Sequence, residues 1–260
     1  MTGGSEPFAP ADLVQRFDPA LFACLLFAPE PGRARLMTLT AFDIELSRAE
    51  HAARKAADTG PLLAQMRLQF WRDRVAEAYD GQPPRAHEVA EPLARLIAET
   101  APPRPALEAM IDAREMELGA PLVDLARWAE ARFGGWIRAG TAALGCPPSD
   151  TAGPAAQAMG RAFLLRTAAA LARAGTPLLP SSDPDTLARL ARETRADVAD
   201  ARTRRSATPR VLTPLYLPLA EAERRAAETL ADPQRMVERG PSRPHPGALR
   251  LIWPAMTGRW

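Results

Sequence analysis

The sequence is poor in cysteine and almost free of lysine. Its 260 residues include two cysteines, Cys24 and Cys146, and one lysine, Lys55. Two cysteines cannot supply a disulfide framework or a cysteine-rich metal cluster, so we expect a reducing compartment. The net charge is only +2. A balance this close to neutral does not favour a nucleic-acid partner.

Long apolar runs are also missing. No stretch of 18 or more apolar residues occurs, so we expect no membrane span. The opening residues lack a basic segment followed by an apolar one, which argues against a signal peptide. We therefore expect a cytoplasmic protein. Two arginine-rich stretches, 202–205 and 235–243, leave peripheral contact with the inner membrane open.

Strand signals are absent as well. Valine and isoleucine are scarce, no segment alternates apolar and polar residues, and alanine, leucine, arginine and glutamate dominate. These features predict an all-α protein. We expect a flexible arm over 1–10, one helical domain over 11–231 and, over 232–260, a Pro/Arg-rich loop (232–247) followed by a C-terminal helix of the same domain. The helices predicted by periodicity span 11–27 (with a break or kink at Pro19), 33–57, 62–79, 89–100, 106–118, 123–144, 186–203, 214–231 and 249–256. In the helix over 62–79 we expect Met66, Phe70, Trp71 and Val75 to face the core.

One stretch, Gly153–Ser182, contains no aspartate or glutamate, although charged residues make up 25% of the protein. Its large apolar side chains recur at helical spacing and alanine fills most of the remainder, which predicts a buried central helix. Gly175 is suited to the C-terminal cap, and Pro177 prevents continuation. The lack of acids here limits what chemistry this helix can support.

Three groups of polar residues deserve a chemical interpretation. Asp43, Ser47 and His51 share one helical face, which allows a Ser-His-Asp relay but is more typical of a polar stripe, because relays place the nucleophile on a turn. Two carboxylate stripes have the spacing that can hold Mg²⁺. The interleaved arginines Arg114, Arg192 and Arg195 indicate instead that the stripes form solvated, ion-paired helix faces. The first stripe is Glu108, Asp112 and Glu115, and the second is Glu193, Asp197 and Asp200.

An ordered set of segments resembles the squalene/phytoene synthase family. The resemblance runs from about Pro19 to Ala227, and no single motif decides it. It implies the all-α isoprenoid synthase fold, with helices around a central cavity. The segments are LTAF at 39–42, MRLQFWRD at 66–73, YDGQPP at 79–84, MIDAREMEL at 110–118, WAE at 128–130 with Gly134, Arg166, and LLP at 178–180.

The resemblance also implies a site that this chain has altered. Active members of the family join two prenyl diphosphates through two Asp-x-x-x-Asp motifs that bind Mg²⁺. The corresponding positions here are Ser47 and His51 in the first motif and Thr167 and Leu171 in the second. Further cavity positions of the family correspond to Ile44, Gly160, Phe163 and Arg166, of which only the arginine is retained.

Without these carboxylates a leaving diphosphate has no metal to stabilise it. The chain is similar to the branch of the family that acts in assembly of respiratory complex I, with AFDIEL at 41–46 and MRLQFW at 66–71. We therefore expect a catalytically inactive protein without a cofactor, which binds a protein partner of a respiratory complex or an isoprenoid lipid.

Two alternatives remain. One is an active Mg²⁺-dependent head-to-head prenyltransferase that recruits acids such as Asp112, Glu115, Asp197 and Asp200. The other is a helical scaffold with a filled core and no ligand.

Overall fold

The described part of the chain is helical throughout, as the composition predicted. The structure is a computed structural model that describes residues 9–55, 60–119, 121–242 and 248–260, with the side chains at 49–55 and 248–252 excluded. No strand occurs in these ranges. The helices are α1 (Pro10–Phe17), α2 (Pro19–Leu25), α3 (Gly32–Lys55), α4 (Gly60–Tyr79), α5 (Ala90–Thr100), α6 (Arg104–Leu118), α7 (Leu125–Ala129), η1 (Glu130–Gly134), α8 (Gly135–Ala143), α9 (Ala152–Arg173), α10 (Pro184–Thr203), η2 (Arg205–Ala207), η3 (Arg210–Leu212), α11 (Thr213–Tyr216), α12 (Pro218–Ala231), α13 (Pro233–Arg239) and α14 (Ala248–Thr257).

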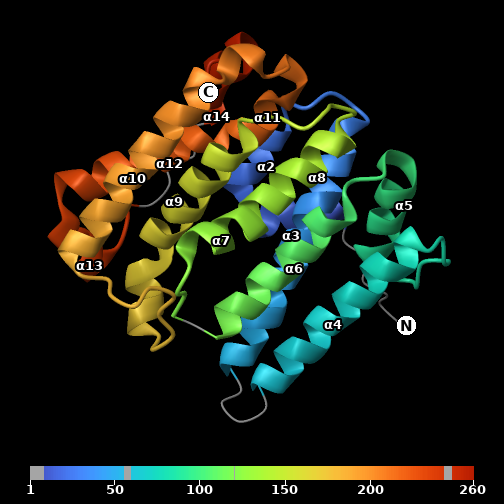
Figure 1. The fold of residues 1–260 in the computed structure, drawn as a ribbon, viewed down its shortest axis with the longest axis horizontal. Helices are drawn as coiled ribbons and strands as arrows, with labels where there is room; N and C mark the ends of the chain where they lie inside the picture. The colour runs from blue at the N-terminus through green and yellow to red at the C-terminus, as the bar shows by residue number, and fades with distance from the viewer. Residues whose placement is uncertain (1–8, 56–59, 120, 243–247) are drawn as a thin grey trace, which may run out of the picture.

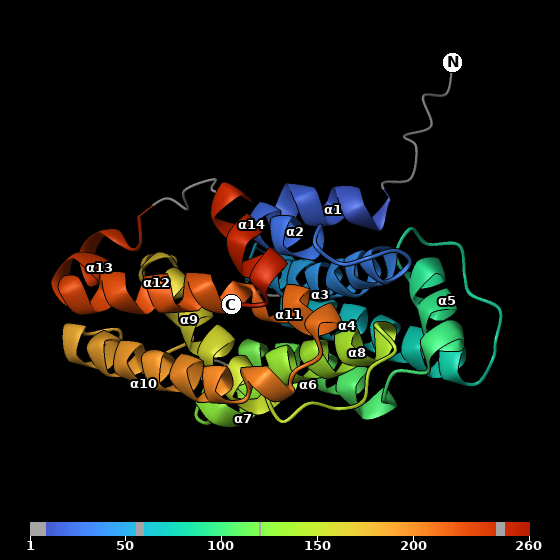
Figure 2. The ribbon, with the colours of Figure 1, turned by 90° about the horizontal axis from the view of Figure 1, so that it is seen from above.

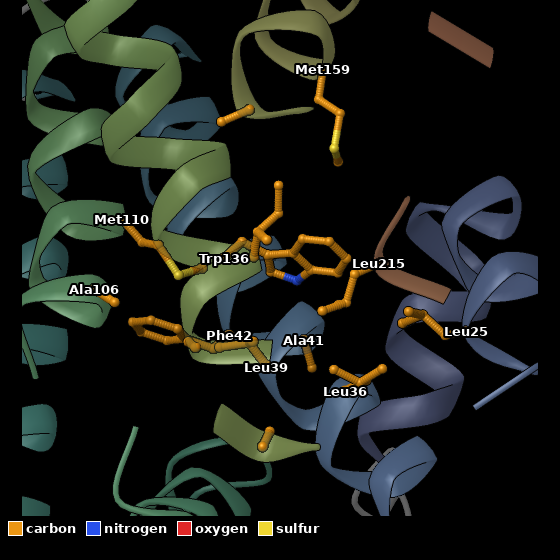
Figure 3. Packing of buried hydrophobic residues seen from close by; sticks show 14 of the residues in the cluster. Leu25, Leu36, Leu39, Ala41, Phe42, Ala106, Met110, Trp136, Met159 and Leu215 are labelled. Atoms are coloured by element: carbon orange, nitrogen blue, oxygen red, sulfur yellow. The ribbon is translucent and has the colours of Figure 1, made fainter. Parts of the chain in front are cut away.

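Two long helices organise the fold. α3 packs against α1, α4, α5, α6 and α8, whereas α9 packs against α10, α12, α13 and η1 (Figure 1). α3 contributes to the first of two buried apolar clusters, and α9 contributes to both. In the first cluster the ring of Phe42 lies beside Met110, and the indole of Trp136 extends to the other side (Figure 3). The indole nitrogen of Trp136 donates a hydrogen bond to Oγ1 of Thr40 at 3.2 Å, so this buried polar group is satisfied.

Local sequence explains where several helices begin. Asp18 accepts a hydrogen bond from the backbone N–H of Leu21 and Pro19 opens α2, so the predicted break within 11–27 is confirmed. The same Asp-Pro pair occurs at Asp232 and Pro233, where it starts α13. The interpretation of 232–247 as a loop was therefore wrong for Pro233–Arg239. Residues 243–247 lie outside the described ranges.

Most of the acid-free stretch lies in α9, and 11 of the 22 residues of this helix are buried. Gly175 follows the helix with φ of 71°, a left-handed conformation that glycine adopts without strain. Other predictions about which side chain faces inward were less accurate. Met66, expected in the core from its spacing on α4, is 61% exposed.

Among the described residues, no helix combines the length and the apolar character needed to cross a bilayer.

Candidate functional site

The hydroxyl groups at two of the positions that the resemblance assigns to the metal-binding motifs bond to their own helices. Oγ of Ser47 on α3 donates to the carbonyl oxygen of Asp43 at 3.1 Å, and Oγ1 of Thr167 on α9 donates to the carbonyl oxygen of Phe163 at 2.8 Å. Leu171, one turn further along α9, is half-buried against the second apolar cluster. The side chain of His51 lies outside the described residues. The three described positions therefore carry two hydrogen-bonded hydroxyl groups, those of Ser47 and Thr167, and the apolar side chain of Leu171.

Two of the further cavity positions take part in close packing. Ile44 is buried on α3. Gly160 lies where α9 touches α7, and a Cβ atom at this position would be 2.5 Å from Cβ of Ala129. Any side chain at residue 160 would force the two helices apart, because real Cβ atoms do not approach so closely. The glycine is therefore required by the packing of α9 on α7.

Two guanidinium groups contact the ring of Phe163. Cζ of Arg132 lies 4.0 Å from the centroid of the Phe163 ring, and Cζ of the exposed Arg166 lies 5.3 Å from it. The ring also contacts Trp128 and Phe133, at centroid distances of 5.9 and 6.2 Å. Cation–π contact of this kind is strongest when the cation is shielded from water. The side chain of Arg132 is 7% exposed, so the contact with Phe163 meets that condition.

A buried ionic network connects α3, α6, α7 and η1. The Arg114 guanidinium donates to Oδ1 of Asp43 at 2.7 Å and to Oε2 of Glu117 at 3.0 Å. Oε1 of Glu117 accepts from Arg132 at 2.9 Å and from the indole N–H of Trp128 at 2.8 Å. The side chains of Glu117 and Arg114 are almost completely buried. We call Asp43, Arg114, Glu117, Trp128 and Arg132 the central network.

Mutual attraction keeps this network ionised. Burial alone would raise the pKa of Glu117, but Arg114, Arg132 and the Trp128 hydrogen bond outweigh burial and hold the pKa below its usual value. Burial and the neighbouring charge of Arg114 lower the pKa of Arg132 to about 10, against the attraction of Glu117. Both groups are therefore charged at neutral pH. The network combines two guanidinium groups with two carboxylates and is close to electrically neutral.

A π-helical turn positions Arg132. The segment predicted as one helix over 123–144 is three elements, α7, η1 and α8, and η1 is a single π turn. A π turn contains an extra residue, which rotates the side chains that follow it relative to an α-helix.

The Gly134–Gly135 pair at the end of η1 was expected to kink the helix or admit a close neighbour. A Cβ at Gly135 would be 2.5 Å from the carbonyl oxygen of Ala106, so α8 does approach α6 very closely.

The Ser-His-Asp relay that the spacing allows, and that was judged less typical than a polar stripe, is not assembled in the described residues. The carboxylate of Asp43 pairs with Arg114, while Ser47 bonds to the backbone of Asp43 rather than to its side chain. His51 cannot be placed, because its side chain lies outside the described residues.

Both carboxylate stripes are ion-paired with arginine. Arg72 bridges Asp112 and Glu115 at 2.7 and 2.8 Å, and Arg104 pairs with Glu108 at 2.7 Å. In the second stripe Arg161 bridges Glu193 and Asp197 at 3.0 and 2.5 Å, and Arg204 pairs with Asp200 at 2.5 Å. The expectation of ion-paired faces is confirmed. The donors are not the interleaved arginines, however, since Arg114 is buried in the central network.

The described residues do not fit a magnesium site. No group of three or more His, Cys, Asp or Glu side chains in these ranges is placed to hold a metal ion. Mg²⁺ is bound by oxygen ligands, chiefly carboxylates. Each acid that the alternative hypothesis would recruit already bonds to an arginine. No step of a metal-dependent reaction can be derived from this arrangement.

Sequence reasoning missed the central network. Glu117 and Arg132 carry no motif, and Arg114 was assigned to a solvated face. All three residues lie within the segments 110–118 and 128–134, which carry the family resemblance. That shared location is the signal that could have identified them. A buried acid between two arginines is visible only once the helices are packed.

The helical fold and the segments around the site define the class of protein. The squalene/phytoene synthase family model matches residues 14–183, so the chain belongs to this family. Two solved structures share the fold. The squalene synthase HpnC from Alicyclobacillus acidocaldarius superposes with a TM-score of 0.66 at 16% identity, covering 84% of this chain and 90% of that one. A dehydrosqualene synthase in complex with ligand gives a TM-score of 0.65 at 11% identity, covering 96% and 94%.

A curated relative is named for a different process. The NADH dehydrogenase (ubiquinone) complex I, assembly factor 6 homolog of Drosophila melanogaster is 28% identical over 88 residues. The match covers 34% of this chain and 25% of the fly protein, so the chain spans about a quarter of that relative's length.

Proposed function

We propose that the chain is a catalytically inactive member of the squalene/phytoene synthase family that binds a protein partner and acts in assembly of respiratory complex I. The observation that carries the proposal is the central network. It joins two arginines and two carboxylates of α3, α6 and η1, and its Arg132 contacts the ring of Phe163 on α9. An active member would need an excess of negative charge there to gather Mg²⁺ around a diphosphate.

The two altered positions that carry hydroxyls support the same proposal. Ser47 and Thr167 donate their hydroxyl hydrogens to carbonyl oxygens of their own helices, and neither side chain supplies the negative charge with which a carboxylate holds Mg²⁺. The similarity to the fly assembly factor supports the choice of partner, because the aligned protein is named for assembly of complex I.

An isoprenoid lipid is the second ligand that the family resemblance implies. We favour the protein partner, because the ring of Phe163, the Arg132 guanidinium and the indole of Trp128 pack against one another between α7, η1 and α9. An apolar chain at this place would have to displace the buried Arg132 from Glu117, and breaking a buried ion pair is costly.

The direct test of inactivity uses the purified chain with farnesyl or geranylgeranyl diphosphate and Mg²⁺. We expect no release of diphosphate and no condensed product, with an active squalene synthase as the positive control. Turnover that disappears on addition of a chelator would contradict the proposal and favour the Mg²⁺-dependent prenyltransferase.

The direct test of the partner uses the host cell. Deletion of the gene should lower NADH oxidation by isolated membranes and cause partly assembled complex I to accumulate on native gels, and expression of the wild-type chain should restore both. Full assembly in the deletion strain would refute the role in complex I and leave a lipid-binding role to be tested with labelled isoprenoids.

A further inference from the structure

A histidine caps the N-terminus of α5. Nδ1 of His87 accepts hydrogen bonds from the backbone N–H groups of Val89 at 3.1 Å and Ala90 at 3.3 Å. The carbonyl oxygen of His87 accepts from the N–H of Glu91 at 3.2 Å, which is the first bond of the helical pattern. An N-cap residue has this arrangement, because its side chain satisfies the N–H groups two and three positions further along the helix. His87 is therefore the cap of α5, although the bounds of the helix begin at Ala90.

The two bonds fix the protonation state of the ring. A ring nitrogen that accepts from two N–H groups carries no hydrogen, so the neutral ring of His87 has its hydrogen on Nε2. A further proton can bind only at Nδ1, because a neutral imidazole has one free lone pair. Protonation therefore turns the acceptor into a donor that faces two other donors. The partial positive charge at a helix N-terminus adds to this conflict.

The ring is held in place by α4 and is still within reach of solvent. Its centroid lies 5.2 Å from that of Trp71 and 5.8 Å from that of Phe70. His87 is half-buried, and all the residues of the preceding stretch 82–86 are exposed. Val89, two residues further on, is buried in the first apolar cluster. His87 therefore joins an exposed loop to a buried helix, at a point where protons can reach it.

The charged groups on the helices around the ring have both signs. Arg74 is buried, and its Nη2 donates to Oε1 of Glu77 at 2.5 Å. Its Cζ lies 5.2 Å from the centroid of Phe70, the same ring that contacts His87. The charged residues one helical turn from Phe70 or Trp71 on α4 are Arg67, Asp73 and Arg74. α3 also packs on α5, and its ion pair with that helix, Arg35 with Glu99, lies at the opposite end of α5.

The capped segment itself adds one cation and two acids. They are Arg85, Glu88 and Glu91. The carboxylate of Glu91 lies 3.7 Å from Arg95. Arg74 and the helix N-terminus oppose a positive charge on the ring, whereas Glu88 and Glu91 favour it. Because these influences oppose one another, the hydrogen bonds that protonation breaks set the direction of the response.

We propose that His87 is a proton-sensitive cap, which releases the first turn of α5 and the end of the 82–86 loop when Nδ1 takes up a proton. Histidine ordinarily changes charge between about pH 5 and 8, so the cap is present at pH 7.5 and is lost toward pH 5.0. The opening stays local, because the buried side chains of Val89 and Leu93 keep α5 on the first apolar cluster. The inference does not depend on the proposed role in complex assembly, since it rests on a different part of the molecule.

An aspartate cap elsewhere in the chain provides an internal reference. The N–H of Thr186 on α10 donates to Oδ1 of Asp183 at 2.7 Å. Hydrogen bonds from the hydroxyl of Ser181 and the backbone of Thr186 lower the pKa of Asp183 to about 2, so this cap stays ionised at pH 5.0. α5 lies at one end of the molecule and α10 runs toward the other end, beside α13 (Figure 2). The two caps therefore report on separate places in one sample.

Amide hydrogen exchange of the full-length chain, followed by NMR, tests the proposal. The protection factors of the Val89 and Ala90 amides should fall about fivefold between pH 7.5 and pH 5.0, because loss of a side-chain cap typically weakens a helix end by about this factor. The protection of Thr186 should stay constant. Unchanged protection of Val89 and Ala90 would overturn the proposal. An equal fall at Thr186 would also overturn it, because the response would then be general acid unfolding.

The matched variant is His87→Asn. Asparagine is a good N-cap and does not titrate, so the protection of Val89 and Ala90 should no longer depend on pH. A fall equal to that of the wild type would show that another group senses the proton and would refute the assignment to His87. The ¹⁵N chemical shifts of the wild-type ring give a readout that needs no variant. At pH 7.5 they should show hydrogen on Nε2, and a ring with hydrogen on Nδ1 would contradict the proposal even if His87→Asn fails to fold.

Discussion

Replacement of Glu117 by glutamine is the sharpest test of the central network. Glutamine has nearly the same shape and can still accept the hydrogen bond from the Trp128 indole, but it removes the charge that neutralises Arg114 and Arg132. Asp43 would remain as the single carboxylate for two guanidinium groups, and it contacts only Arg114. The variant therefore isolates the electrostatic contribution of one buried charge.

The expected cost follows from burial. The side chains of Glu117 and Arg114 are 0% and 1% exposed, so water cannot replace the lost carboxylate. Removing one partner of a buried ion pair typically costs about 3–5 kcal/mol, because the remaining charge is left uncompensated. Whole domains are stable by about 5–15 kcal/mol. At roughly 2–4 °C for each kcal/mol in a protein of this size, Tm should fall by about 6–20 °C.

Urea unfolding followed by circular dichroism measures this cost. The midpoint should fall while the slope m stays constant, since the same surface is exposed on unfolding. The double variant Glu117→Gln with Arg132→Met provides the control, because it removes the unpaired cation and fills its place with an apolar side chain. We expect it to recover at least about 2 kcal/mol of the loss, since apolar replacements of buried ion pairs are often tolerated. A single variant that costs less than about 1 kcal/mol, or a double variant no better than the single one, would refute the account of the network.

Two further predictions concern α9 and the C-terminal segment. Gly160→Ala should destabilise the protein by about 1–3 kcal/mol in urea unfolding, because its Cβ would clash with Ala129. The control is Gly153→Ala on the same helix, which has open space around it and should be neutral or stabilising by up to about 1 kcal/mol. Equal effects of the two substitutions would contradict the close approach of α9 to α7. Glu228 accepts hydrogen bonds from the backbone N–H and the hydroxyl of Ser242, and although burial opposes ionisation, these bonds and nearby arginines lower its pKa to about 2 from 4.5. The ionised Glu228 side chain therefore stabilises the fold fully above about pH 4.5, and this contribution is lost as the pH falls toward 2. Glu228→Gln should lower the free energy of unfolding by at most about 3 kcal/mol at pH 7 and progressively less in acid. A loss independent of pH would rule out the charge of Glu228 as its cause.

The helical class and several boundaries could be predicted because they depend on local chemistry. The break at Pro19 and the cap at Gly175 follow from the backbone preferences of those residues, which act whatever the tertiary context. The helix at Pro233 had the same kind of signal, an aspartate cap before a proline, but a high content of proline and arginine favoured a loop. The carboxylate stripes were correctly assigned to ion-paired faces.

The central network could not be predicted, for two physical reasons. Arg114 stands among acids on its helix, a pattern typical of a solvated face, and only the packing of α6 between α3 and η1 turns it inward. Arg132 lies in a π turn, where the extra residue shifts the helical register, so that counting by 3.6 over 123–144 assigns the wrong side chains to the interior. The prediction that Met66 is buried was wrong for a related reason, because periodicity on α4 does not show where the neighbouring helices end.

The neutrality of the central network bears directly on what this member of the family can do. A site that gathers Mg²⁺ around a diphosphate must hold several carboxylates together without cations, and their repulsion is relieved only when the metal binds. Here Arg114 and Arg132 already relieve the repulsion between Asp43 and Glu117, and no metal is needed to keep the helices together. The acid-free α9 and the internal cations of the central network are therefore compatible features, and the protein's own arginines stabilise the centre of the fold. Introduction of aspartates on α9 alone would leave Arg114 and Arg132 in place, so it would not by itself create the excess of negative charge that a Mg²⁺ site requires.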